Sequence, residues 1–172
     1  MKKLVIAVSG INAVDNPGPG VAVARSLKED RDLNVTTIGL AYDAMEPGIY
    51  LDWIVDQTYL MPYPSLGGDA VVERLLEIKA EQGLDLVIPN LDAELPVYIR
   101  YAKVLRSHGI RVLVPSMSQF QLRAKDQLVG SAPEWGCETP PTMVIHSMGE
   151  LEGALAKLGL PVMVKGCFYE AY

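Results

Sequence analysis

Residues 4–20 read LVIAVSGINAVDNPGPG and join a short apolar run to a turn rich in glycine and proline. The run Leu4–Val8 has the length and the composition of a buried strand, and it is too short for the apolar core of a secretory signal. A glycine-rich turn between a first strand and a first helix is a place where α/β sheets bind anionic ligands. The stretch therefore predicts an α/β fold with a ligand site after its first strand.

Further apolar runs alternate with helical segments along the first two thirds of the chain, as expected for a parallel sheet with helices on its faces. The predicted strands are residues 4–8, 35–40, 53–56 or 57–60, 84–89 and 111–115. The predicted helices are residues 20–29, 69–82 and 95–108. Gly83 and Gly109 follow two of these helices, where glycine commonly ends a helix. We expect residues 1–115 to form a doubly wound α/β domain.

A different pattern begins at Ser116, which with Gln119 can cap a new helix. We predict a helix over residues 119–134, weakened at Pro133, and a second helix from Ser147 to about Leu158. Strands are predicted at residues 142–146 and 162–165. A strand–helix–strand unit of this size is too small to bury its own sheet face. We therefore expect residues 116–172 to be an incomplete α+β segment of a longer chain.

The composition excludes several classes of protein. The 172-residue chain has 15 Lys and Arg against 21 Asp and Glu, a formal net charge of −6, and 49% of its residues are hydrophobic. This balance is typical of a globular chain without the basic stripe that a nucleic acid requires. No run approaches the roughly 20 apolar residues of a membrane span, and two cysteines are too few for a disulfide framework. We expect a soluble cytoplasmic protein with no nucleic-acid or membrane partner.

Small and polar residues gather where an α/β sheet binds its ligands, after the first and the fourth predicted strands. The first group is the turn at residues 9–20, and the second is NLDAE at residues 90–94. The predicted substrate-binding residues are Gly10, Asn12, Gly18, Gly20, Asn90, Asp92 and Glu94. A structural alternative exists for both groups, because glycines can simply shape a loop and acidic residues can cap a helix.

The histidines and cysteines form no recognisable catalytic or metal-binding pattern. His108 precedes Gly109 at a predicted helix end, where a cation interacts well with the helix dipole. His146 ends a predicted strand, and neither histidine has triad or metal spacing with Cys137 or Cys167. We therefore predict no metal ligand in this chain and assign no catalytic residue.

Three motifs follow one another in the last third of the chain: RAKD at residues 123–126, GCETPPT at residues 136–142 and LPVMVK at residues 160–165. Their order resembles the opening of an ATP-grasp domain, in which a lysine on an entry helix precedes a G-x-x-x-P-P-T turn and a strand ending in a second lysine. Residues 1–115 are then similar to the Rossmann-like domain that precedes ATP-grasp in biotin carboxylase and carbamoyl phosphate synthase. Residues 116–172 would be the N-terminal piece of the ATP-grasp domain.

In that superfamily two lysines reach the phosphates and the adenine side of ATP, and Lys125 and Lys165 match them. The resemblance implies the N-terminal part of an ATP-dependent carboxylate ligase or carboxylase. The complete enzyme would transfer the γ-phosphate of ATP to a small carboxylate, and an amine or similar nucleophile would attack the acyl phosphate. Mg²⁺ is implied too, but its ligands would lie beyond Tyr172, so we expect no turnover by this chain alone.

The resemblance has one departure, and two other functions are open. The segment GCFYEAY after Lys165 lacks the glycine-rich lid of biotin carboxylase. A dinucleotide-binding domain of an oxidoreductase would use the glycine-rich turn and Asp43 as the ribose-binding acid, although the turn does not have the G-x-G-x-x-G spacing. A non-catalytic interaction module would use the uncovered apolar face of residues 116–172 to bind a partner, or a second copy in a homo-oligomer.

Overall fold

The computed structural model describes residues 3–13 and 17–166 of the chain. The chain divides into two compact units, Met1–Pro115 and Ser116–Tyr172. The first unit holds both hydrophobic core clusters, and the second has a few buried side chains of its own, including Phe120 and Ala154. No helix within the described residues is long and apolar enough to cross a membrane.

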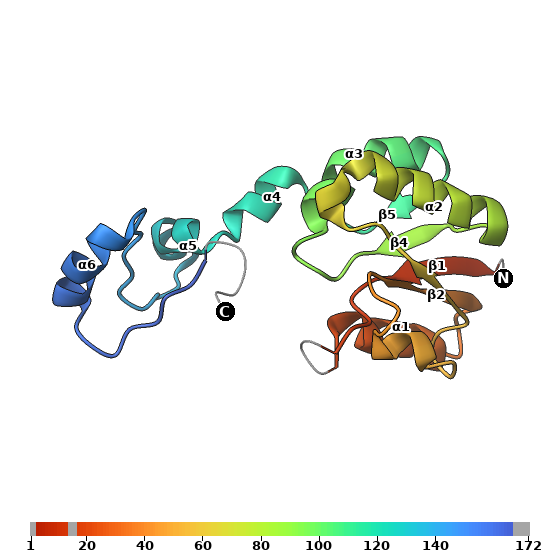
Figure 1. Cartoon of the computed structure of the whole chain (residues 1–172), viewed down its shortest axis with the longest axis horizontal. Coiled ribbons are helices and arrows are strands. Elements are labelled where there is room, and N and C mark those ends of the chain that lie inside the picture. The colour runs from red at the N-terminus through yellow and green to blue at the C-terminus, as the bar shows by residue number, and fades with distance from the viewer. Residues whose placement is uncertain (1–2, 14–16, 167–172) are drawn as a thin grey trace. The chain divides into compact units, whose positions relative to one another are not determined.

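The first unit is built on a five-stranded parallel sheet with the strand order β3-β2-β1-β4-β5 (Figure 1). The strands are β1 (Leu4–Val8), β2 (Val35–Ala41), β3 (Gln57–Leu60), β4 (Leu86–Ile88) and β5 (Arg111–Val112). Starting from β1, the chain adds β2 and then β3 on one side of the sheet. It then crosses to the other side of β1, where it adds β4 and β5. The strand order therefore reverses between β1 and β4, which is where doubly wound sheets bind ligands, outside the carboxyl ends of the strands.

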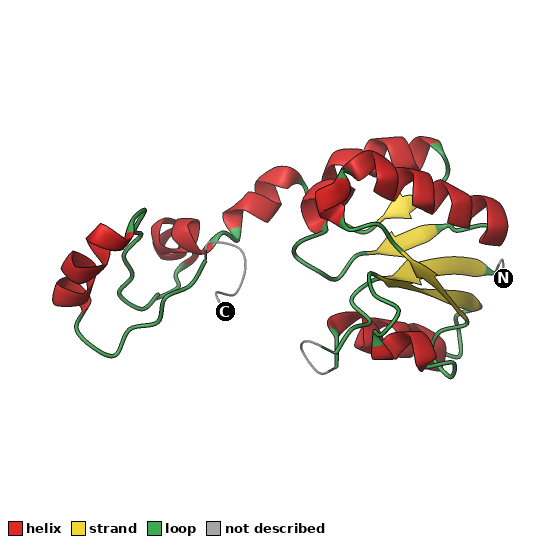
Figure 2. Cartoon of the chain, in the orientation of Figure 1, coloured by secondary structure: helices red, strands yellow, loops and turns green. Residues whose placement is uncertain are grey.

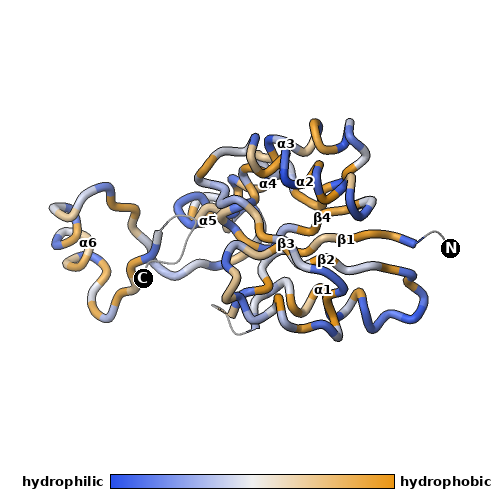
Figure 3. The backbone as a smooth tube through the Cα atoms, turned by 45° about the vertical axis from the view of Figure 1, so that its right-hand side comes forward, coloured by the Kyte–Doolittle hydropathy of each residue, from blue (hydrophilic) through white to orange (hydrophobic). Residues whose placement is uncertain are grey.

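Helices cover both faces of this sheet. Helix α1 (Pro19–Glu29) lies on one face, and α2 (Gly68–Gln82) and α3 (Leu95–Ser107) lie on the other (Figures 1 and 2). Single 3₁₀ turns at Pro47–Tyr50 and Pro64–Leu66 precede and follow β3. Strands that are buried on both faces have no polar side, and β1 and β4 are accordingly hydrophobic along their length (Figure 3).

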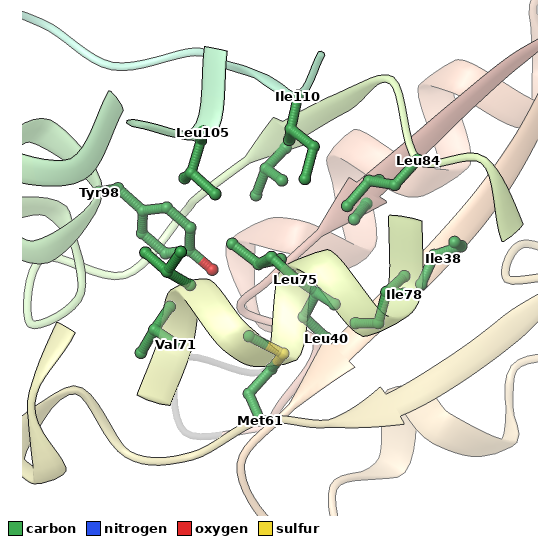
Figure 4. Packing of buried hydrophobic residues seen from close by; sticks show 13 residues of the cluster. Ile38, Leu40, Met61, Val71, Leu75, Ile78, Leu84, Tyr98, Leu105 and Ile110 are labelled. Carbon is green, nitrogen blue, oxygen red and sulfur yellow. The ribbon is translucent and has the colours of Figure 1, made fainter. Parts of the chain in front are cut away.

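The larger hydrophobic core lies between the sheet and the helices α2 and α3 (Figure 4). Its buried members are Ala7, Ile38, Leu40, Met61, Val71, Val72, Leu75, Ile78, Leu84, Val87, Tyr98, Leu105 and Ile110. A smaller core on the opposite face packs Ala24 of α1 against Ile54 and Val55. Removal of these apolar side chains from water is the main force that holds the first unit together.

The predicted doubly wound parallel sheet is confirmed, and all three helices of the first unit begin and end within one residue of their predicted bounds. Of the two positions predicted for the third strand, residues 57–60 is correct. The strands predicted at 84–89 and 111–115 are shorter, Leu86–Ile88 and Arg111–Val112. Gly83 and Gly109 both have left-handed backbone, with φ of 75° and 76°, as helix-ending glycines require.

The second unit is mainly helical. Its helices are α4 (Met117–Leu122), α5 (Lys125–Ser131) and α6 (Leu151–Leu158), with 3₁₀ turns at Ala132–Trp135 and Met148–Glu150. The capping box of Ser116 and Gln119 is present. The prediction of a single helix over 119–134 is wrong, because residues 123–124 are not helical and separate α4 from α5.

The strands predicted at 142–146 and 162–165 are also wrong: within the described part of the second unit the chain forms no strand. A strand exists only through hydrogen bonds to a neighbouring strand, and residues 116–166 contain no such pairing. The apolar content of both segments predicts burial or strand pairing, but most of their apolar side chains are exposed, including Met143, Val144, Met163 and Val164.

Candidate functional site

The glycine-rich turn after β1 closes on itself through its own backbone. The amide of Gly20 donates to the carbonyl of Gly10 at 2.9 Å, and the amide of Gly18 donates to the carbonyl of Asn12 at 3.0 Å. The amide of Val21 donates to Gly18 at 3.0 Å, and the proline between Gly18 and Gly20 has no N–H. The N–H groups that begin α1 are thus bonded to carbonyls rather than directed at an anion, unlike a phosphate-binding turn.

At two positions of this turn only glycine fits, because the backbone lies so close to another backbone segment that a Cβ atom would overlap it. A Cβ atom at Gly20 would overlap the carbonyl oxygen of Ser9, and one at Gly18 would overlap the carbonyls of Gly10 and Asn12. Gly10 itself has a φ of 73°, which glycine adopts without a steric cost. These contacts account for the three glycines by packing alone.

Glu94 lies beneath the carboxyl end of the sheet and is fully buried. One of its oxygens, Oε1, accepts from the Ser9 hydroxyl and from the backbone amides of Asn90 at 2.9 Å and Leu91 at 3.0 Å. The other oxygen, Oε2, accepts from the Tyr42 hydroxyl at 2.5 Å. The donors come from the ends of β1, β2 and β4, so this carboxyl group joins three strands at the point where the strand order reverses.

Burial sets the protonation of this cluster. Burial raises the pKa of Glu94 above its ordinary value, although the four hydrogen bonds that it accepts act in the opposite direction. Burial, followed by the neighbouring Glu94 carboxyl, raises the pKa of Tyr42 well above its ordinary value. Tyr42 therefore stays a neutral hydrogen-bond donor at physiological pH.

Asn90 ties the ends of β1 and β4 together. Its side-chain amide donates to the carbonyls of Ser9 at 3.1 Å and Ile88 at 2.9 Å, and its backbone amide donates to the Ser9 hydroxyl at 2.9 Å. Asp92 lies half-buried in the turn between Asn90 and α3. Through these hydrogen bonds Asn90 holds the carboxyl ends of β1 and β4 together.

A pocket of about 380 Å³ opens at this edge of the first unit. It is lined by Asn12, Tyr42, Asp43, Glu46, Tyr63, Pro64, Leu91, Ala93 and Glu94, and we call it the tyrosine pocket. The rings of Tyr42 and Tyr63 stack with centroids 5.5 Å apart and planes inclined by 23°.

Two of the predicted substrate-binding residues, Asn12 and Glu94, line the tyrosine pocket, whereas Gly10, Gly18 and Gly20 do not. Asn90 and Asp92 are likewise not among its lining residues. Sequence reasoning missed Tyr42, Glu46 and Tyr63 as pocket residues. Tyr42 directly follows β2, so its position at the carboxyl edge was readable from the sequence, whereas the stacking with Tyr63 depends on tertiary structure.

Asp43, which the dinucleotide hypothesis uses as a ribose ligand, holds a turn. Its carboxylate accepts from the backbone amide of Met45 at 2.7 Å, and its carbonyl accepts from the amide of Glu46 at 3.1 Å. Such side-chain-to-backbone bonds are the usual role of Asp after a strand. Together with the bonded amides at the start of α1, this arrangement does not favour a dinucleotide.

The second unit contains a pocket of about 690 Å³ whose lining includes both Lys125 and Lys165. Lys125 is the first residue of α5, and Lys165 is an exposed residue near the end of the described chain. Aliphatic residues make up much of the wall, namely Leu128, Val129, Val144, Ile145, Leu151, Ala154, Leu155, Leu158, Val162 and Val164. We call this cavity the lysine pocket. Two ammonium groups beside an apolar wall suit a ligand with both an anionic and an apolar part.

Neither the cysteines nor the histidines form a site in the described residues. Cys137 is an exposed free thiol, and Cys167 lies outside the described residues. His108 is the C-cap residue of α3, and the backbone amide of His146 donates to the Glu150 carboxylate at 3.0 Å. Across residues 3–13 and 17–166, no three His, Cys, Asp or Glu side chains are grouped so that they could hold a metal ion.

Comparison with known proteins finds similarity to solved structures and, because the sequence identities are low, this similarity concerns the fold alone. No protein-family model matches the sequence. No curated protein matches it either. Among solved structures, the biotin carboxylase domain of Hydrogenobacter thermophilus 2-oxoglutarate carboxylase is similar over 93% of this chain and 33% of its own length, with a TM-score of 0.55 and 19% identity.

Two further structures give the same result. The biotin carboxylase domain of a single-chain bacterial carboxylase matches 98% of this chain and 37% of its own, with a TM-score of 0.57 and 18% identity. Rhizobium etli pyruvate carboxylase matches 99% of this chain and 16% of its own, with a TM-score of 0.57 and 16% identity. The chain thus spans about a third of the biotin carboxylase domains that it resembles, and the likeness extends over both of its units.

Proposed function

We propose that this chain contributes the N-terminal, Rossmann-like domain and the first part of the ATP-binding domain to an ATP-dependent carboxylase or carboxylate ligase of the ATP-grasp type. The observation that carries the proposal is that Lys125 and Lys165, which are 165 − 125 = 40 residues apart in sequence, line one pocket. The similarity to biotin carboxylase domains supports it, because that similarity covers nearly the whole chain.

The lysine pocket fits a nucleotide in size and in chemistry. Its volume of about 690 Å³ is within the range of about 300–1,000 Å³ that is usual for small-molecule sites. An ammonium group is a compact positive charge that suits phosphate oxygens, and an aliphatic wall suits a purine ring. We assign Lys125 and Lys165 to the phosphate-bearing part of ATP and the aliphatic wall to the base.

The reaction that this site would serve is phosphoryl transfer. ATP supplies the γ-phosphoryl group, and the lysines offset the negative charge that develops on it. The Hydrogenobacter domain was solved with MgADP, ADP and bicarbonate, which supports a small carboxylate such as bicarbonate as the acceptor. The described residues contain no group of three His, Cys, Asp or Glu side chains that could hold a metal ion, and we assign none of them to Mg²⁺.

An ATP derivative that carries an acyl group on its terminal phosphate tests the assignment, because it transfers that group to a lysine amine beside the phosphates. We expect mass spectrometry to find the label mainly on Lys125 and Lys165, and we expect excess ATP to suppress it. Lys157 is the matched control, since it is exposed on α6 and does not line the pocket. Equal labelling of Lys157, or labelling of the two pocket lysines that ATP does not reduce, would contradict the proposal.

A parallel measurement separates this proposal from the dinucleotide hypothesis. A ligand that binds only the folded chain raises its unfolding temperature, and the rise grows with the ratio of the free ligand concentration to the dissociation constant. We expect ATP, and neither NAD nor NADP, to raise the unfolding temperature. Protection by NAD or NADP alone would favour the dinucleotide hypothesis despite the closed turn after β1.

A further inference from the structure

We propose that the tyrosine pocket of the first unit is a binding site for a small organic ammonium ion. The pocket lies at the carboxyl edge of the sheet beside the reversal of strand order, where open α/β sheets bind their ligands. The inference concerns the first unit alone and is independent of the nucleotide proposal for the lysine pocket.

The charges around the tyrosine pocket select the sign of its ligand. Three carboxyl groups line it, those of Asp43, Glu46 and Glu94, and none of its described lining residues is Lys, Arg or His. Asp43 is exposed and Glu46 is half-buried, so both present carboxylates near the opening. An anionic ligand such as a phosphate or a carboxylate would be repelled here, whereas a cation would be attracted.

The aromatic side chains select an organic cation over a metal ion. Tyr42 and Tyr63, whose rings stack on each other, both line the pocket, and Tyr63 is half-exposed, at 52%. Aromatic faces attract ammonium groups through the ring quadrupole, and such contacts are a common means of recognising alkylated ammonium ions. Although three carboxyl groups line the pocket, no three His, Cys, Asp or Glu side chains among the described residues are grouped so that they could hold a metal ion.

The carboxylates near the opening are held in place by the backbone, which pre-organises the site. Glu46 Oε1 accepts from the amide of Tyr42 at 2.8 Å, and the Asp43 carboxylate accepts from the amide of Met45 at 2.7 Å. Beneath them, the Tyr42 hydroxyl is fixed by its hydrogen bond to Glu94. A cation would therefore find its partners already oriented, which reduces the entropic cost of binding.

Choline and its uncharged carbon isostere, 3,3-dimethylbutan-1-ol, test the proposal because they share one shape and differ in charge. Each compound is titrated into the full chain at constant ionic strength, and amide signals are followed by nitrogen-15 NMR. We expect choline to shift the signals of residues 42–46, 63 and 91–94 in a saturable way, and the alcohol to bind at least about tenfold more weakly. Equal binding of the two compounds, or shifts spread evenly over the chain, would overturn the proposal.

A charge-removing variant provides the second arm. The double substitution Asp43→Asn and Glu46→Gln keeps an acceptor oxygen for each backbone amide while it removes both charges. We expect the variant to weaken choline binding about fivefold or more, and its affinity for the alcohol to stay unchanged. The matched control Glu73→Gln with Glu152→Gln removes two exposed charges that do not line the pocket, and it should bind choline like the wild type. An equal loss in both variants would show a general charge effect and would also overturn the proposal.

Discussion

Glu94 is a buried acid that accepts hydrogen bonds from Ser9, Tyr42, Asn90 and Leu91. Burial raises its pKa above the ordinary value of 4.5, so the folded chain holds the proton more tightly than the unfolded chain. By linkage, the contribution of this group to the free energy of unfolding is greatest below pH 4.5 and declines as the pH rises through the raised pKa.

Glu94→Gln and Glu94→Ala separate the charge of this residue from its hydrogen bonds. Gln retains an acceptor oxygen and cannot ionise, so we expect Glu94→Gln to flatten the fall in stability above pH 4.5. Ala removes the acceptor of the Ser9 and Tyr42 hydroxyls and of the Leu91 amide, whereas the Asn90 amide keeps its bond to the Ser9 hydroxyl. We expect Glu94→Ala to lower the free energy of unfolding by about 3 kcal/mol or more. Urea unfolding across the pH range measures both. A Glu94→Gln variant whose stability still falls with pH as steeply as that of the wild type would refute this explanation.

Comparison of Tyr98 with Tyr42 tests how much the hydrogen bond of a tyrosine hydroxyl contributes to the free energy of unfolding. The Tyr98 hydroxyl is buried without a hydrogen-bond partner, and its ring lies among the apolar side chains of the core (Figure 4). The Tyr42 hydroxyl donates to Glu94. We expect Tyr98→Phe to be at least as stable as the wild type in urea unfolding, and Tyr42→Phe to lose about 1–2 kcal/mol. Equal losses in the two variants would show that the Tyr98 hydroxyl has a partner in solution.

The start of α1 is fixed against the end of β1 by contacts between their backbones. A Cβ at Gly20 would meet the Ser9 carbonyl, and neither atom can move without shifting the helix or the strand. We expect Gly20→Ala to lower the free energy of unfolding by about 2 kcal/mol or more. Gly130→Ala in α5 is the control: a Cβ there meets nothing within 4 Å, and we expect no loss of stability. Thermal unfolding of both variants checks the contrast, and a tolerated Gly20→Ala would mean that the turn can rearrange.

The helices and strands of the first unit were predictable because local and tertiary signals agree there. Glycines end α2 and α3 where the apolar periodicity stops, and β1 carries an unbroken apolar run. The ends of the strands were less predictable. Leu84 precedes β4 but is fully buried, so its hydrophobicity reflects packing of its side chain in the core and not membership of the strand. Residues 142–146 and 162–165 show the same limit, because an apolar segment does not reveal whether a partner strand exists.

The candidate sites were predictable in position and less so in composition. Topology places the ends of β1 and β4 side by side, and the polar residues after them were identified from the sequence. The sequence did not indicate that Glu94 is buried and accepts a hydrogen bond from Tyr42, since both features depend on how three loops pack together. The two lysines were found from motif order, and their shared pocket is a property of the folded second unit.

Both hydrophobic core clusters consist of residues of the first unit. A domain with its own core folds independently. We therefore expect a fragment of residues 1–115 to unfold cooperatively and to retain the amide NMR signals that these residues have in the full chain. Loss of cooperative unfolding in the fragment, with the full chain as the control, would show that residues 116–172 are needed for the fold.

The two pockets occupy separate units, so their ligands can be examined one at a time. The tyrosine pocket lies in the first unit and the lysine pocket in the second. The acyl-transfer probe reports on Lys125 and Lys165, whereas choline reports on residues 42–46. Failure of one experiment therefore leaves the result of the other intact.

The arrangement around Glu94 has a consequence for protein engineering. The side chains of Ser9, Asn90 and Glu94 hold the three strand ends together through hydrogen bonds. Asp43, Glu46 and Tyr63 line the pocket and take no part in these bonds. A library that randomises Asp43, Glu46 and Tyr63 and conserves Ser9, Asn90 and Glu94 would allow new ligand preferences to be selected on an unchanged scaffold.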